Sequence, residues 1–223
     1  MAASLQDSIT EVEAAYKRDH AVEFRNNFGA SGTLAREIEE GAPVDALISA
    51  GAKPMDQLER EGLLVQGSRA DLLRNALVLI APGGLGGSDL KGFHWLAGKS
   101  VRTVALGDPE SVPAGQYAKQ TLVSLHLYDA LQSKIVLGKD VRQVLTYVET
   151  GDADAGLVYA TDAEISKKVR IVAIAPDGSH DPIVYPVAQI RKSNEDAAVR
   201  EFIAFLRSPA AKAIFERHGF RMA

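Results

Sequence analysis

Short apolar runs of strand-like character alternate with amphipathic helical segments along nearly the whole chain, and this alternation limits the folds open to it. Leu5, Ile9 and Val12 recur at helical spacing, whereas residues 75–81 form a continuous apolar run of strand length. A β/α succession of this kind predicts an α/β fold in which mostly parallel sheets are flanked by helices. The 223 residues are enough for one large domain or for two lobes of about 100 residues each.

The same patterns predict where the elements lie. Strands are expected around Val22 and Phe24 and over 46–49, 75–81, 101–106, 135–137, 155–159, 171–175 and 183–190. Helices are expected over 5–16, 34–41, 114–125, 141–149, 195–206 and 209–217. The two long apolar strands at 75–81 and 183–190 are predicted to cross between two lobes and to act as a hinge. The first lobe then comprises 1–79 plus 189–223, and the second comprises 80–188.

Composition excludes several classes of protein. The net charge is −4 and Lys and Arg are scattered, so no basic surface for nucleic acid or anionic lipid is expected. The chain has no cysteine, which rules out disulfides, thiolate metal sites and cysteine nucleophiles. No run approaches the roughly 20 apolar residues of a membrane span. No charged segment precedes an apolar one at the start, so a signal peptide is absent from this chain.

The motifs that carry enzymatic chemistry are missing or out of register. The glycine-rich run 82–87 and the Gly98-Lys99-Ser100 tripeptide suggest a phosphate loop, but Phe93 stands where that motif needs glycine, so the run is read as a surface turn. The five histidines have no metal-ligand spacing, and no GxSxG elbow is present. We therefore expect no enzyme, no cofactor and no free metal cation site.

Four segments place a small or hydroxyl residue where a helix is about to begin. They are Ala2–Ser4, Gly29–Ser31, Val112–Gly115 and Lys139–Val141. The first turn of a helix has N–H groups without intrahelical acceptors and carries partial positive charge, so converging helix starts can bind an anion. Taken singly, each segment reads as an ordinary helix cap. The presence of four in one chain favours anion binding.

A family resemblance rests on stretches that keep their order along the whole chain. They are AASLQDSI at 2–9, GASGTLAREIEEGAPVDALISA at 29–50, NALVLIAP at 75–82, GDPESVPAGQYAKQ at 107–120, KDVRQVLTYVETGDADAGLVYATDA at 139–163 and YPVAQI at 185–190. Through them the chain resembles the periplasmic molybdate-binding proteins of ABC transporters. The resemblance implies a two-lobed periplasmic-binding-protein fold.

The resemblance also implies the ligands of a tetrahedral oxyanion. It assigns Ser4 and Ser31 through hydroxyl and backbone N–H, Ala114 and Val141 through backbone N–H, and Tyr159 through its phenol. Four of these coincide with the helix starts, whereas Tyr159 would otherwise be read as a core residue. Molybdate or tungstate is then expected to bind between the lobes and to pass to the membrane permease of an ABC transporter, with the receptor a periplasmic monomer that has no nucleic-acid partner.

Members of this family have a β-strand directly before the AASL turn, and the present sequence starts at Met1 without it. Either the native chain begins further upstream, or another segment fills the place of that strand in the first lobe. The loss of a strand would leave neighbouring backbone groups unpaired. Whether a strand precedes the AASL turn therefore affects how the backbone at Ser4 is positioned.

The expected donors are neutral, and this bears on selectivity. A rigid ring of amides and hydroxyls measures size, so an anion smaller than molybdate or tungstate leaves donors unpaired. The alternatives are a receptor for sulfate or another tetrahedral oxyanion, the ligand-sensing domain of a transcription regulator, and an enzyme on the same fold. The residues do not rank molybdate against tungstate.

Overall fold

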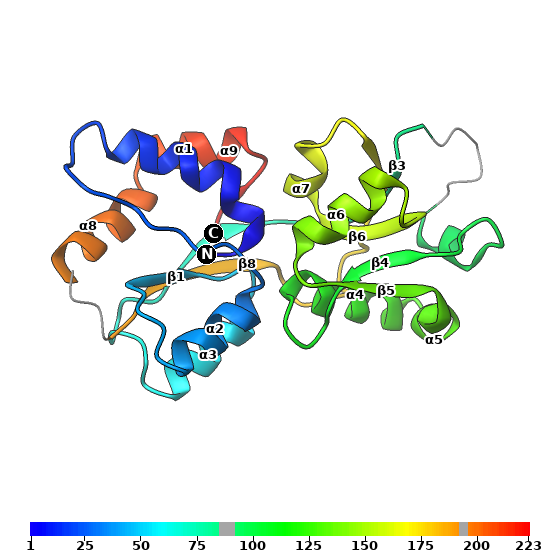
Figure 1. The fold of residues 1–223 in the computed structure, drawn as a ribbon, viewed down its shortest axis with the longest axis horizontal. Coiled ribbons are helices and arrows are strands. Elements are labelled where there is room, and N and C mark those ends of the chain that lie inside the picture. Colours follow the sequence, from blue (N-terminus) through cyan, green and yellow to red (C-terminus); the bar gives the residue numbers. More distant parts are fainter. Residues whose placement is uncertain (85–91, 192–195) are drawn as a thin grey trace. The chain divides into compact units, whose positions relative to one another are not determined.

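The computed structural model describes residues 1–84, 92–191 and 196–223, and the chain forms two compact units. Unit 1 comprises Met1–Arg74 and Val184–Ala223, and unit 2 comprises Asn75–Ile183 (Figure 1). These boundaries differ from the expected lobes, 1–79 plus 189–223 and 80–188. The reason is that the chain passes from one unit to the other where each of the two long strands begins, at 74/75 and 183/184, and not near their ends. The proposed turn at 82–87 lies partly outside the described residues.

Unit 1 contains one four-stranded sheet. Its strands are β1 (Ala46–Ile48), β2 (Ala70–Arg74), β8 (Val184–Gln189) and β9 (Arg221–Met222), in the order β1-β8-β2-β9. Its helices are η1 (Ala3–Leu5), α1 (Gln6–Tyr16), α2 (Ser31–Glu39), α3 (Ala52–Arg60), α8 (Asp196–Leu206) and α9 (Pro209–Arg217). Every pair of neighbouring strands in this sheet is antiparallel.

Two expectations for unit 1 are therefore wrong. The sheet is not mostly parallel, because β8 returns from far along the chain and runs between β1 and β2 in the opposite direction to both. No strand forms around Val22 and Phe24, where the described backbone has no regular structure. The Phe24 ring instead packs against Phe202, with ring centroids 4.7 Å apart. The alternation of apolar residues there arises because side chains pack against α8, not because the segment pairs in a sheet.

Unit 2 contains a five-stranded mixed sheet. Its strands are β3 (Leu77–Pro82), β4 (Val104–Gly107), β5 (Ile135–Gly138), β6 (Ala155–Tyr159) and β7 (Val169–Ile174), in the order β5-β4-β6-β3-β7. Its helices are η2 (Phe93–Ala97), α4 (Pro113–Ser124), α5 (Tyr128–Leu131), η3 (Gln132–Lys134), α6 (Val141–Thr150) and α7 (Ala160–Glu164). Figure 1 shows α6 and α4 on opposite faces of this sheet.

The parallel prediction holds for part of unit 2 only. Strand β4 pairs in parallel with both β5 and β6, as expected for a β/α succession. Strand β3 pairs antiparallel with both β6 and β7. Three adjacent strands, β5, β4 and β6, therefore run in one direction and end at one edge of the sheet.

The start of the chain is tied to two other segments of unit 1. The Ala2 amide donates to the Ile48 carbonyl at 2.9 Å, and the Ala3 amide donates to the Gly29 carbonyl at 3.0 Å. Ala2 also forms a parallel bridge with Gly29. These bonds pair the backbone at the end of β1 and hold the segment before Ser4 next to the segment before Ser31.

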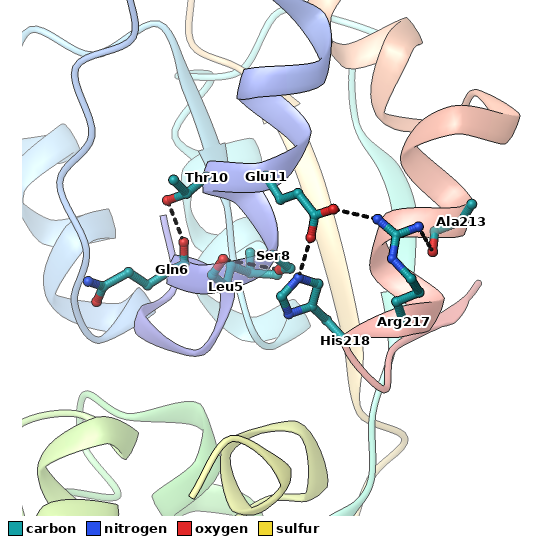
Figure 2. Close-up of polar contacts among 8 residues, drawn as sticks. All are labelled: Leu5, Gln6, Ser8, Thr10, Glu11, Ala213, Arg217 and His218. Carbon is teal, nitrogen blue, oxygen red and sulfur yellow. Dashed lines mark hydrogen bonds and ion pairs between the residues drawn. The ribbon is translucent and has the colours of Figure 1, made fainter.

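Two clusters hold the helices of unit 1 in place. The apolar faces of α2 and α3 pack on the sheet through a buried core of Leu34, Ala35, Ile38, Leu47, Met55, Leu58, Leu64, Ala188 and Ile190. On the outside, Glu11 of α1 pairs with Arg217 and with His218 at the end of α9, and His218 Nε2 lies 2.9 Å from Glu11 Oε2 (Figure 2). The first cluster positions α2, which begins at Ser31, and the second holds α1, which directly follows the turn that contains Ser4.

Candidate functional site

Ser4 lies in the short helical turn η1 and is buried. Its Oγ is 2.9 Å from the phenol oxygen of Tyr185 on β8, and either oxygen can be the donor. A hydroxyl has one hydrogen to donate and two lone pairs to accept with. If Tyr185 donates to Ser4, the serine hydrogen can be directed to a ligand. Sequence reasoning missed Tyr185, although it begins the YPVAQI stretch.

Ser31 is the first residue of α2 and is also buried. The helix cap is Ala30, so the ordinary cap interpretation of Ser31 does not hold. Its Oγ accepts a hydrogen bond of 2.9 Å from the Ala50 amide, which leaves the hydroxyl hydrogen to donate elsewhere. The Ser31 amide lies in the first turn, where no intrahelical acceptor exists. Ser31 therefore presents two donors from one residue.

Ala114 lies in the first turn of α4 and is fully buried. Pro113 precedes it and has no N–H, so the Ala114 amide is the first donor of this helix. The helix start is fixed by close contact with the end of β4, because a Cβ placed on Gly115 would lie 2.0 Å from the Gly107 carbonyl oxygen. Only glycine allows the backbones to approach this closely.

Val141 is the first residue of α6 and is buried. Asp140 caps the helix by accepting from the Gln143 amide at 2.8 Å, and Gln143 Oε1 accepts from the Lys139 amide at 2.7 Å. These reciprocal bonds satisfy two donors at the helix start and fix the direction in which the Val141 amide points.

Tyr159 ends β6 and has 1% of its surface exposed. It pairs with Leu77 of β3, and the following Ala160 amide donates to the Ala76 carbonyl at 2.9 Å. Within unit 2, Ala114, Val141 and Tyr159 thus follow or form the carboxyl ends of three adjacent parallel strands. Ligands of open α/β sheets bind at this edge.

An ion pair lies next to one of these donors. Arg142 follows Val141, and its Nε lies 2.7 Å from Oδ1 of Asp162, a residue of α7 with no exposed surface. Sequence reasoning missed this pair, since nothing in the spacing of Arg142 and Asp162 predicts their contact.

The five sequence-predicted residues fall into two sets. The structure brings Ser4 and Ser31 to adjoining segments of unit 1, and it places Ala114, Val141 and Tyr159 at one sheet edge of unit 2. In the described ranges, no group of three or more His, Asp or Glu side chains is arranged to hold a metal ion. No helix in that same part of the chain is both long and apolar enough to cross a membrane.

Known proteins share both the sequence and the fold. Residues 1–221 match the family described as bacterial extracellular solute-binding protein. The molybdate-binding protein ModA of Haemophilus influenzae is 40% identical over 98% of this chain and 87% of its own length. The protein of that name from Escherichia coli is 39% identical over 98% of this chain and 86% of its own length. The periplasmic molybdate-binding protein of Azotobacter vinelandii, a solved structure, matches with a TM-score of 0.88 and 25% identity over 100% of this chain and 97% of that one.

These findings confirm several expectations. The match to the Azotobacter vinelandii structure confirms the periplasmic-binding-protein fold. The matched family consists of solute-binding proteins, which confirms the expectation of a binding protein rather than an enzyme. The family is described as extracellular, in agreement with the expected periplasmic location. With 221 of the 223 residues matched, the chain belongs to the bacterial extracellular solute-binding protein family.

Proposed function

We propose that the protein binds molybdate or tungstate outside the cytoplasm and delivers it to the membrane permease of an ABC transporter. The observation that carries the proposal is the placement of Ala114, Val141 and Tyr159 at the carboxyl ends of β4, β5 and β6. We propose that two helix-start amides and the Tyr159 phenol act there as neutral donors. The relatives at about 40% identity that carry the name of molybdate-binding proteins support the choice of ligand.

The proposed ligands are the hydroxyls and amides of Ser4 and Ser31, the amides of Ala114 and Val141, and the phenol of Tyr159. A doubly charged oxyanion stripped of water needs several donors, and each charge-assisted hydrogen bond contributes about 1.5–3 kcal/mol. Helix starts add a favourable dipole without a mobile side chain. We propose that both sets of donors bind the same anion.

Rigid donors also support the anion selectivity that we propose. The starts of α4 and α6 are fixed by the Gly107–Gly115 approach and by the Asp140 cap, so their amides cannot follow a smaller ion. Sulfate is smaller than molybdate and would leave donors unpaired, at about 1–3 kcal/mol for each. Hydrogen phosphate carries a hydrogen of its own, which would point at a donor of the site and find no acceptor there. The site is therefore expected to select large, fully deprotonated tetrahedral dianions.

Isothermal titration with molybdate, tungstate, sulfate and phosphate tests the proposal. Molybdate and tungstate should bind with similar dissociation constants, and sulfate should bind at least tenfold more weakly, which is about 1.4 kcal/mol. Binding of sulfate as tight as that of molybdate would contradict the size argument and would favour a receptor for sulfate or another tetrahedral oxyanion.

Delivery to a permease is tested separately. The protein should stimulate molybdate uptake by its transporter in proteoliposomes and should run as a monomer with and without ligand in size-exclusion chromatography with light scattering. A dimer in solution, or uptake that does not depend on the protein, would contradict this part of the proposal.

A further inference from the structure

A buried ion pair joins two segments that carry proposed ligands. Arg142 Nε lies 2.7 Å from Asp162 Oδ1, with 22% of the arginine side chain exposed and none of the aspartate. Arg142 directly follows Val141 in the first turn of α6. Asp162 lies in α7, which begins directly after Tyr159.

Helix α6 packs closely on β6, so the ion pair can control how the start of α6 lies relative to the end of β6. A Cβ on Gly156 of β6 would lie 2.8 Å from Val148 and 3.2 Å from Val144 of α6, so the helix lies directly on the strand that ends at Tyr159. The position of the Val141 amide relative to the Tyr159 phenol therefore depends on how α6 is seated. The ion pair holds the α6 end that contributes the amide.

Stability alone is a weak reason for such a pair. The desolvation cost of two buried charges can exceed their attraction, and replacing both with apolar side chains of similar volume is often neutral or stabilising. A buried pair is better explained where it specifies one geometry. Here that geometry is the spacing of two oxyanion donors.

The pair also removes a net charge next to the proposed ligand. An unpaired guanidinium one residue from the Val141 amide would attract every anion through a field that does not depend on anion size. The Asp162 carboxylate compensates that charge at 2.7 Å. Discrimination is then left to the fixed neutral donors.

We infer that Arg142 and Asp162 are positioning and specificity-determining residues of the oxyanion site. Their ion pair seats the start of α6 against the strand that ends at Tyr159, and it cancels the arginine charge, so the site measures anion size. This inference rests on the proposed function.

The double variant Arg142→Met/Asp162→Leu tests the positioning role. Its ligand-free melting temperature should stay at or above that of the wild type, because both charges are removed together. Its dissociation constant for molybdate should rise at least tenfold, and the ratio of sulfate to molybdate dissociation constants should fall. The inference would be overturned if the double variant kept its melting temperature and showed the wild-type dissociation constant for molybdate and the wild-type ratio of sulfate to molybdate dissociation constants.

The single variant Asp162→Asn tests charge compensation while keeping the shape of the side chain. With Arg142 uncompensated, binding of both molybdate and sulfate should become more sensitive to added KCl, and the ratio between them should fall. An unchanged ratio and an unchanged salt dependence would overturn the inference. Loss of folding in both variants without ligand would also overturn it, since the pair would then serve the fold.

A control is the more exposed ion pair between Arg69 and Asp56 in unit 1, joined at 2.5 Å, in which Arg69 also pairs with Glu59. Arg69→Met/Asp56→Leu removes the same kinds of charge outside the elements that carry the proposed ligands, so both dissociation constants should stay within twofold of the wild type. The wild type is titrated in parallel. If it does not bind molybdate, the proposed function fails. If it binds and the Arg142 and Asp162 variants match it, only the inference about the pair fails.

Discussion

The Oγ atom of Ser4 lies 2.9 Å from the phenol oxygen of Tyr185, although 181 positions separate the two residues in the chain. Removing the phenol oxygen with Tyr185→Phe takes away one partner of the Ser4 hydroxyl. We expect molybdate binding to weaken by about 0.5–1.5 kcal/mol, the usual value of one such bond. Isothermal titration measures this, with Tyr128→Phe on α5 as the control. Unchanged affinity would show that Tyr185 does not orient Ser4 for binding.

The hydroxyl donors proposed to touch the anion should have larger effects. Ser31→Ala and Tyr159→Phe each remove one donor from a buried charge, so each should weaken molybdate binding by about 1.5–3 kcal/mol. Val141→Ala keeps the main-chain N–H and should cost well under about 1 kcal/mol. Titration of the three variants checks the assignment. A large loss in Val141→Ala alone would mean that its side chain, rather than its amide, matters.

The sequence predicts the local parts of this structure well. The helices expected over 114–125 and 141–149 begin within a residue of the observed starts of α4 and α6. The apolar run 155–159 is the observed β6, and Pro209–Arg217 is the observed α9. Caps, prolines at the first helical position and short apolar runs act within a few residues, so a single sequence carries them.

Long-range pairing is where sequence reasoning fails. The direction of β8 between β1 and β2 depends on contacts between residues more than 100 positions apart, such as Leu47 with Ala188. Alternation of apolar residues does not specify whether a strand runs parallel or antiparallel. For the same reason the alternation around Phe24 predicts a strand, although the Phe24 ring packs on Phe202. No sequence pattern predicts the contact between Arg142 and Asp162. The role of Tyr185 beside Ser4 is likewise a tertiary relationship.

The contact between α1 and α9 should give a pH-dependent contribution to stability. The hydrogen bond from His218 and the pairing with Arg217 hold the pKa of the Glu11 carboxyl below its ordinary value of 4.5. A carboxyl with a lower pKa in the folded state stabilises the fold above its unfolded pKa, and that contribution is lost as the pH falls through the folded pKa. Because Glu11 is exposed, we expect only about 0.2–1 kcal/mol.

Urea unfolding of the wild type and Glu11→Gln measures this contribution. The wild type should be the more stable protein above about pH 4.5, and the difference should shrink as the pH falls toward about pH 3. Arg217→Met should reduce the difference, because it removes one of the two partners. A difference that grows on acidification would contradict the assignment.

The close approach of β4 and α4 should couple stability to binding. A Cβ on Gly115 would lie 2.0 Å from the Gly107 carbonyl oxygen, and backbone cannot yield as a flexible side chain can. Gly115→Ala must therefore push the start of α4 away from the sheet, which should destabilise the protein by about 1–3 kcal/mol. It should also weaken molybdate binding at least tenfold, because the Ala114 amide moves with the helix.

Gly84→Ala is the control, since a Cβ there meets nothing within 4 Å. Thermal melting and titration measure the two effects, and a Gly115→Ala protein that is destabilised but binds molybdate normally would show that the Ala114 amide is not a ligand.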